Sequence, residues 1–268
     1  MGWKDVFGYV RGIAAKRGNS EDQGEGASKG PRVDDGLPMG ARIGSLVQLQ
    51  RSPIIRAQAN GSLVTMPDEG DTRILAISQL RLEPDAALYR LYLATGDLDD
   101  KEKFLQVFSA EDGAVAELLY CTQLARVIPE TAEDQEAYTG EAGHGLGDAT
   151  YTLWREQLAD MLDAATLATV FGEAERIDYT RDAGTPGAAF AAPFTGRETR
   201  IDDAQGGRGL RQQVWFMPYV RTLHGGEREY LLITTEIIES VDGDSGRRGI
   251  HVDFVIGIPL EPERVLVQ

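Results

Sequence analysis

The sequence predicts an α+β protein that is rich in β-strand, with antiparallel sheets in a meander-like order, a few short helices and a tethered N-terminal amphipathic helix. Three observations predict this class. From residue 40 on, short apolar stretches and turn residues recur about every 8–12 residues, a spacing typical of all-β domains. The last third of the chain has the clearest strand patterns, and these predict a strong C-terminal three-stranded sheet. The first 17 residues have helical spacing instead.

The N-terminal segment, residues 1–17, has one apolar stripe at three- and four-residue steps, as an amphipathic helix requires. It holds four basic residues and one acidic residue, a formal charge of +3. Because the whole chain has a net charge of −16, the remaining residues carry −19. Gly8 and Gly12 each weaken a helix by about 1 kcal/mol relative to alanine, so we expect it to need a surface to lie on. The residues expected to contact that membrane or partner surface are Trp3, Lys4, Val6, Phe7, Val10, Arg11, Ile13, Lys16 and Arg17.

Residues 18–36 are rich in Gly, Ser and acidic residues, which predicts a flexible linker. The linker separates the N-terminal helix from a β-rich globular domain over residues 37–268. Within that domain, two lobes at 37–128 and 146–268 are one possible division.

The first lobe is expected to be a β-meander. Residues 41–50 and 62–67 have short strand patterns, with Asn60-Gly61 as a turn between them. Further strands are predicted over 72–82, 87–96 and 104–108. The stretch 114–121 fits either a helix or a strand.

Residues 130–147 predict a short helix and then a glycine-rich loop. The stretch 149–172 has a helical face, although Tyr151–Leu153 also fits a strand, and 175–209 is rich in loop residues. Three strong strands follow, at 211–223, 228–241 and 249–260. Trp154 and Trp215 lie in apolar elements and are expected in the core.

The composition excludes some functions and favours one compartment. A pI near 4.6 and a net charge of −16 argue against nucleic-acid binding, because such a surface repels phosphates. The single cysteine, Cys121, cannot form an internal disulfide, which favours a reducing compartment, and its apolar neighbours predict a buried thiol. With no secretory signal and no apolar run of about 20 residues, we expect a cytoplasmic protein, with a peripheral location on the inner face of the cytoplasmic membrane as a further option.

No motif indicates a cofactor or a metal. "GDSG" at 243–246 lacks the context of a serine nucleophile, and "GHGLGD" at 143–148 fits neither phosphate-loop pattern. His144, His224 and His251 have no metal-ligand spacing. If the protein is an enzyme, its candidate pocket residues are His144, Asp148, His251 and Asp253.

Three stretches resemble the YjfK-like family of uncharacterised bacterial proteins. They are "GLPMGARIGSLVQL" at 36–49, "GEAGHGLGDATYTL" at 140–153, and "EYLLITTEIIES" followed by "IHVDFVIGIPLEPERVLV" near the end. The similarity extends over residues 36–268. It implies a setting in membrane maintenance or envelope stress, since members are encoded beside a phage-shock-protein-A-like, membrane-remodelling protein. It implies no catalytic residues.

We therefore expect a non-enzymatic adapter or accessory protein that binds a protein partner, such as a phage-shock-protein-A-like protein, and an anionic membrane surface. The N-terminal helix can dock on the membrane, on the partner or on its own acidic domain, where charge also attracts it. Two alternatives stay open. One is an enzyme for a small polar substrate that uses His144 and Asp148, and the other is a homo-oligomer that pairs exposed strand edges.

Overall fold

The computed structural model describes residues 31–67, 71–83, 86–95, 101–109, 115–239 and 249–268. The predicted N-terminal helix and most of the predicted linker lie outside the described residues, as does the "GDSG" stretch.

Strands dominate the described chain. The strands are β1 (Leu46–Leu49), β2 (Asp71–Leu82), β3 (Ala86–Leu93), β4 (Lys103–Ser109), β5 (Val115–Val127), β6 (Thr150–Trp154), β7 (Arg176–Arg181), β8 (Phe194–Ile201), β9 (Gly209–Thr222), β10 (Arg228–Glu239), β11 (Ile250–Pro259) and β12 (Val265–Val267). The helices are α2 (Ser52–Ala59), α3 (Ala132–Thr139), α4 (Arg155–Leu158) and α5 (Ala164–Phe171), with short 3₁₀ turns at Pro38–Gly40 and Pro262–Arg264. None of the helices in this part of the chain is both long and apolar enough to cross a membrane.

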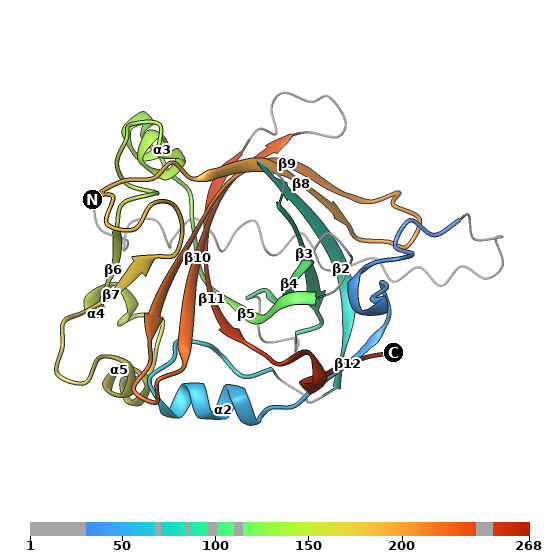
Figure 1. Cartoon of the computed structure of the whole chain (residues 1–268), viewed down its shortest axis with the longest axis horizontal. Helices are drawn as coiled ribbons and strands as arrows, with labels where there is room; N and C mark the ends of the chain where they lie inside the picture. The colour runs from blue at the N-terminus through green and yellow to red at the C-terminus, as the bar shows by residue number, and fades with distance from the viewer. Residues whose placement is uncertain (1–30, 68–70, 84–85, 96–100, 110–114, 240–248) are drawn as a thin grey trace.

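Eight strands close into an antiparallel barrel. Each strand pairs with the next in the order β2-β3-β4-β5-β11-β10-β9-β8, and β8 also pairs with β2, which completes the ring. Figure 1 shows this ring of strands. Outside the ring, β1 and β12 extend the sheet from β2, while β7 and β6 extend it from β9. Closure pairs both edges of most strands and leaves short strands, β12 and β6, at the ends of the sheet.

The interior of the barrel is filled by alternate residues of its strands. In the register of β8 with its two neighbours, Glu198 is opposite Leu80 on one side and Gln212 on the other, and all three are buried. The intervening residues Arg197 and Thr199 are exposed, so the first set points inward. The inward apolar residues form a core of their own: Ala76, Leu80, Leu82, Leu88, Tyr92, Phe104, Leu119, Cys121, Val214, Phe216, Tyr230, Leu232 and Val255.

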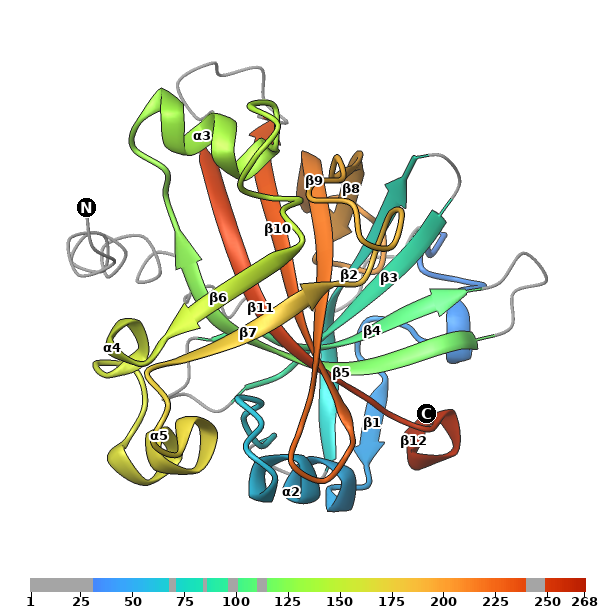
Figure 2. The ribbon, with the colours of Figure 1, turned by 60° about the vertical axis from the view of Figure 1, so that its left-hand side comes forward.

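A second core lies on the outer face, where the helices and β6–β7 pack against the ring. Ile54 of α2, Val170 of α5 and Leu153 of β6 join the outward residues of β9, β10 and β11 in this core. Figure 2 shows β6 and β7 crossing the outside of the barrel beside α4 and α5. Buried Glu229 ties the layers together, because its carboxylate accepts hydrogen bonds from Ser62, Tyr179 and Arg221.

The prediction of antiparallel, β-rich architecture is confirmed, and it is refined by the closure of the barrel. The three C-terminal strands appear as β9, β10 and β11, and the ambiguous stretch 114–121 lies in β5. The predicted helix and glycine-rich loop at 130–147 are present as α3 and the loop after it. The meander is β2 to β5.

Three local predictions are wrong. Residues 62–67 form no strand, and the helix α2 precedes them, because Pro53 sits in its first turn and Ile54 and Ala57 share a buried face. Trp154 is 45% exposed rather than in the core, although Trp215 is buried as expected. The loop-rich stretch 175–209 contains β7 and β8.

Candidate functional site

The residues predicted for an active site fall into two separate groups. His144 is exposed in the loop after α3, and the Asp148 carboxylate accepts a hydrogen bond from the Gly145 amide of the same loop, at 3.0 Å. His251 and Asp253 lie on β11, point into the barrel, and form a group with Glu236 of β10. His144 and Asp148 are not part of that group.

The "GHGLGD" loop is a structural feature. Gly147 has a φ of 117°, and a Cβ atom there would lie 2.2 Å from the Ala191 carbonyl oxygen. Its amide donates to the Tyr219 hydroxyl, and its carbonyl accepts from Arg181. Gly147 therefore allows a close backbone approach, and the positive φ values of Gly143 and Gly145 account for the other two glycines without a phosphate ligand.

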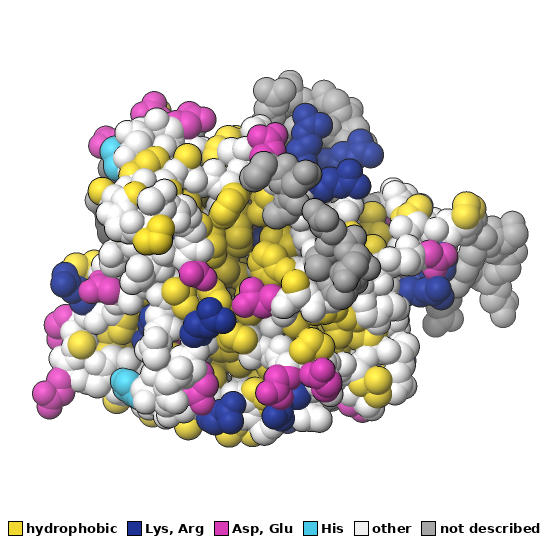
Figure 3. Space-filling model, viewed as in Figure 1, with side chains coloured by type: hydrophobic (Ala, Val, Ile, Leu, Met, Phe, Trp, Pro, Cys, Tyr) yellow, Lys and Arg dark blue, Asp and Glu magenta, His cyan; other side chains and the backbone are white. Residues whose placement is uncertain are grey.

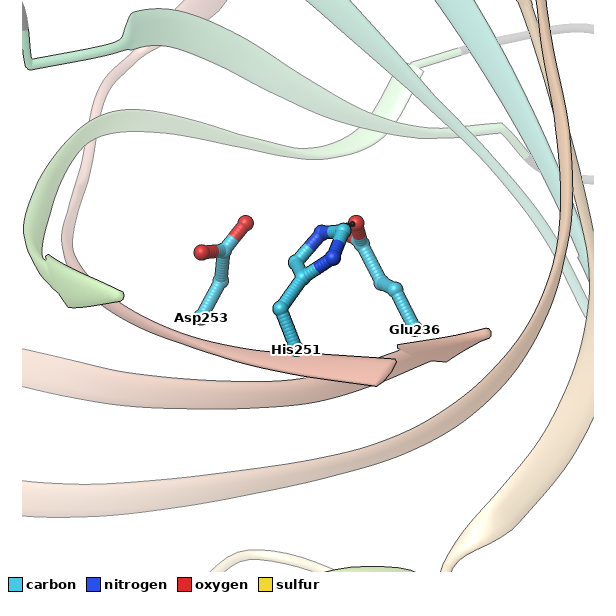
Figure 4. A group of neighbouring side chains, drawn as sticks. All are labelled: Glu236, His251 and Asp253. Atoms are coloured by element: carbon cyan, nitrogen blue, oxygen red, sulfur yellow. Dashed lines mark hydrogen bonds and ion pairs between the residues drawn. The ribbon is translucent and has the colours of Figure 1, made fainter. Parts of the chain in front are cut away.

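Glu236 and His251 form a hydrogen-bonded pair inside the barrel. They are direct register partners on β10 and β11, and their Oε2 and Nε2 atoms are 2.7 Å apart. Burial alone would raise the pKa of Glu236, but the His251 hydrogen bond and the charges of His251, Arg90 and Arg126 outweigh it and lower the pKa to about 2. Glu236 is therefore a stable carboxylate. In Figure 4 the three side chains rise from one face of the β10–β11 pair.

Asp253 is held by an arginine fork. Arg126 of β5 donates from Nε and Nη2 to the two carboxylate oxygens, at 2.6 Å each, and Gln123 adds a third bond at 2.9 Å. Arg126 also lies 3.6 Å from Glu102, which in turn pairs with Arg200 at 2.9 Å. This chain of alternating charges runs along one end of the barrel.

Arg90 of β3 crosses the centre of the barrel. β3 and β10 lie on opposite sides of the eight-strand ring, and Arg90 donates to Thr234 of β10 at 2.8 Å. It also lies 3.4 Å from Glu236 and 3.7 Å from Glu198 of β8, with 3% of its side chain exposed. Burial raises the pKa of Glu198 above its ordinary value, while Arg90 opposes the rise and Glu236 adds to it.

These residues define what we call the interior charge cluster. Its members are Arg90, Glu102, Arg126, Glu198, Arg200, Glu236, His251 and Asp253. Apolar residues such as Leu82, Leu88 and Tyr230 fill the opposite end of the barrel, so its two ends differ in chemistry. In the view of Figure 3, hydrophobic side chains gather at the centre of this face and charged ones lie mainly around it.

The Glu236, His251 and Asp253 group has ligand atoms within 4.8 Å of one another, the spacing of a metal site. Its donor atoms, however, already have partners. Both Asp253 oxygens bind the Arg126 guanidinium, and His251 Nε2 bonds to Glu236. A divalent cation would have to displace a guanidinium and stay beside two arginines, which opposes binding by charge.

The one thiol is not a nucleophile. Cys121 lies in the inner core, fully buried, and burial raises its pKa far above the ordinary value. Reactive cysteines need the opposite environment, with partial exposure and nearby positive charge that lower the pKa. The predicted buried structural role of Cys121 is confirmed.

Comparison with known proteins gives a family. A family model described as "Protein of unknown function (DUF2491)" matches residues 18–265. The chain belongs to this family. No curated protein and no solved structure matches it. The DUF2491 match includes all eight barrel strands, so the interior charge cluster lies entirely within the family's domain.

The sequence indicated His251 and Asp253 but none of the other six members of the cluster, which are Arg90, Glu102, Arg126, Glu198, Arg200 and Glu236. A usable signal was present for two of them, because Arg90 interrupts the apolar series Leu88, Tyr92 and Glu236 interrupts a strongly apolar strand. A charged residue on the inward phase of such a strand must have a buried partner. The sequence holds no such signal for Glu198, because the outward residues of its strand are polar and the strand has no apolar pattern for a charge to interrupt.

Proposed function

We propose that this DUF2491 protein is a non-enzymatic accessory protein that acts by binding a protein partner. The observation that carries the proposal is the charge segregation of the chain, with +3 on residues 1–17 and −19 on the remainder. The site chemistry is consistent with it, because the interior acids are paired with arginines or His251 and the single thiol is inert.

We infer the setting from the resemblance to the YjfK-like family. That resemblance supports a proposed setting in bacterial membrane maintenance or envelope stress. The proposed partner is a phage-shock-protein-A-like, membrane-remodelling protein. The proposed location is the cytoplasm, with part of the population on the inner face of the membrane.

The N-terminal segment is the proposed contact. Its apolar stripe with Trp3 and Phe7 suits the headgroup boundary, and its four basic residues favour anionic lipid. At about 1 kcal/mol each, they supply about 4 kcal/mol, which corresponds to a dissociation constant near 1 mM. Binding through one copy is therefore weak and reversible, and an assembled partner strengthens it by avidity.

Co-sedimentation with lipid vesicles tests the membrane contact. The full chain is compared with a deletion of residues 1–17 and with a full-length variant in which Lys4, Arg11, Lys16 and Arg17 are all glutamine. Vesicles are either phosphatidylcholine alone or a mixture with phosphatidylglycerol. We expect only the full chain to sediment, and only with the anionic vesicles. Equal sedimentation of all three proteins, or none, would contradict the membrane contact.

A second measurement tests the partner contact. Purified phage-shock-protein-A-like protein from the same cell is titrated onto the full chain and onto the deletion, with a change in light scattering or polarisation as readout. We expect saturable binding that weakens at least tenfold on deletion. Absence of binding to the full chain would overturn the proposed partner.

A further inference from the structure

Two glutamine side chains inside the barrel each keep one polar atom without a hydrogen-bond partner among the described residues. Gln106 accepts a bond from Arg90 through Oε1, but its Nε2 donor is unpaired. Gln212 donates from Nε2 to Glu198 at 2.6 Å, but its Oε1 acceptor is unpaired. Their exposed fractions are 0% and 6%. Buried polar atoms are nearly always paired, so such atoms indicate a missing water, ion or ligand.

The two unpaired atoms lie at the two ends of one chain of side chains. Gln106 is on β4 and Gln212 is on β9, which lie on opposite sides of the ring. Between them, Arg90 contacts Gln106 at 3.3 Å and Glu198 at 3.7 Å. The site therefore lacks an acceptor on one side of the barrel and a donor on the other.

Charge distinguishes a ligand from water at this site. Counted without His251, the interior charge cluster has three arginines and four carboxylates, a formal charge of −1, and Asp202, which pairs with Arg200 at 2.8 Å, adds a further negative charge. Burying unbalanced charge is costly. A water molecule can complete the hydrogen bonds but adds no charge, and an inorganic cation adds charge but cannot accept a bond from Gln106.

The charged end of the barrel is the side from which solvent reaches the cluster. Side-chain exposure falls from 28% at Arg126 and 20% at Arg200 to 1% at Glu198. The opposite end is filled with apolar side chains. A small polar molecule would therefore enter past Arg126 and Arg200 and meet Glu198 and Gln212 in the interior.

We propose that this half of the barrel binds a small organic cation, namely a protonated amine that also carries a hydrogen-bond acceptor. The ammonium group lies beside the Glu198 carboxylate and donates to Gln212 Oε1. The acceptor group receives the bond from Gln106 Nε2. The pKa of Glu198 is raised by burial and by Glu236, with Arg90 opposing, so a further cation beside that carboxylate would favour its charged form. An anion is disfavoured, since it would lie against Glu198 and Glu236.

Thermal unfolding of the full chain tests the proposal, with ethanolamine hydrochloride as the probe. The measurement is made at about pH 8, where ordinary histidines are neutral. Potassium chloride at equal concentration controls for charge alone, and ethylene glycol controls for a hydroxyl of similar size without charge. We expect the midpoint to rise by about 2–4 °C with saturating ethanolamine and to show no comparable rise with either control.

Three variants locate the effect, each compared with its own midpoint without ligand. Glu198→Gln removes the charge and Gln212→Leu removes the acceptor, so we expect both to abolish the rise. Gln213→Leu is the matched control, because Gln213 is next in β9 but exposed, and it should keep the full rise. If Gln212→Leu does not fold, the presence or absence of the midpoint rise in Glu198→Gln is the deciding result. No rise in the parent, an equal rise with either control solute, or a rise that persists in Glu198→Gln would overturn the proposal.

Discussion

Replacement of Arg90 by methionine is the sharpest test of how the barrel interior is held together. The guanidinium is 3% exposed and is the cation that Glu198 and Glu236 share, at 3.7 and 3.4 Å. Methionine keeps most of the volume but leaves two buried carboxylates facing each other. Removing one partner of a buried ion pair costs about 3–5 kcal/mol, so we expect Arg90→Met to lower the free energy of unfolding by that amount.

Urea unfolding measures this cost, and two further variants identify its origin. Arg81→Met on β2 is the matched control, since Arg81 is exposed on the outside of the same barrel, and it should change the free energy by less than about 0.5 kcal/mol. The double variant Arg90→Met with Glu198→Gln should recover about 1–3 kcal/mol, because one orphaned charge is removed. A loss below about 1 kcal/mol in Arg90→Met, with an unchanged urea slope, would show that Arg90 is not the cation on which the two buried carboxylates depend.

Three other predictions concern particular groups. Because the pKa of Glu236 is lowered to about 2, its stabilising contribution is present above the ordinary value of 4.5 and is lost as the pH falls from 4.5 towards 2. The free energy of unfolding in urea should therefore fall more steeply with acid in the wild type than in Glu236→Gln, by up to about 1.4 kcal/mol per pH unit. Parallel curves for the two proteins would contradict this. Gly147→Ala should lower the free energy of unfolding by about 2–4 kcal/mol, because φ is 117° and the new Cβ meets the Ala191 carbonyl. Gly143→Ala, with a φ of 73° and open space around it, should lower it by about 1–2 kcal/mol. Equal losses in the two variants would count against the close approach at Gly147. Cys121 should react with a thiol-specific disulfide reagent only as fast as the protein unfolds, and rapid labelling of the native protein would disprove its burial.

The sequence predicted those strands whose pattern depends only on local burial. The strands β9, β10 and β11 are long and strongly apolar on at least one face, so alternation alone located them. The closure of the barrel was not predictable in this way. It depends on β2 pairing with β8, and these strands are separated by more than a hundred residues. The strand β8, with exposed Arg197 and Thr199 on its outward face, has no apolar pattern to mark it.

The same limits explain the local errors. Residues 62–67 have the composition of a strand and are largely buried, but they lie outside the sheet, and residues 62–65 line a pocket together with residues of α2 and α5. In the sequence Trp154 lies among apolar residues at helical spacing. In the structure it ends the edge strand β6 and is exposed, with the Arg176 Cζ atom 5.7 Å from the centre of its ring. Tertiary context decides such positions, and the composition of a short stretch does not contain it.

The interior charge cluster was half predictable for a related reason. The sequence indicates His251 and Asp253 as candidate pocket residues, but their direct partners come from β10 and β5. The rest of the cluster comes from β3, β8 and the segments beside them, and only the closed ring brings these groups together. Spacing along one strand can show that a charge points inward. It cannot show which of the seven other barrel strands supplies its counter-charge.

The most direct test of a ligand site in the charged half of the barrel is nuclear magnetic resonance of the glutamine side-chain amides. The spectrum is recorded on the full chain during titration with ethanolamine hydrochloride and, separately, with potassium chloride. We expect the Gln106 and Gln212 amide signals to shift together and to saturate with ethanolamine only, while the signal of exposed Gln213 stays in place. Signals of Gln106 and Gln212 that do not move, or that move equally with potassium chloride, would contradict this expectation.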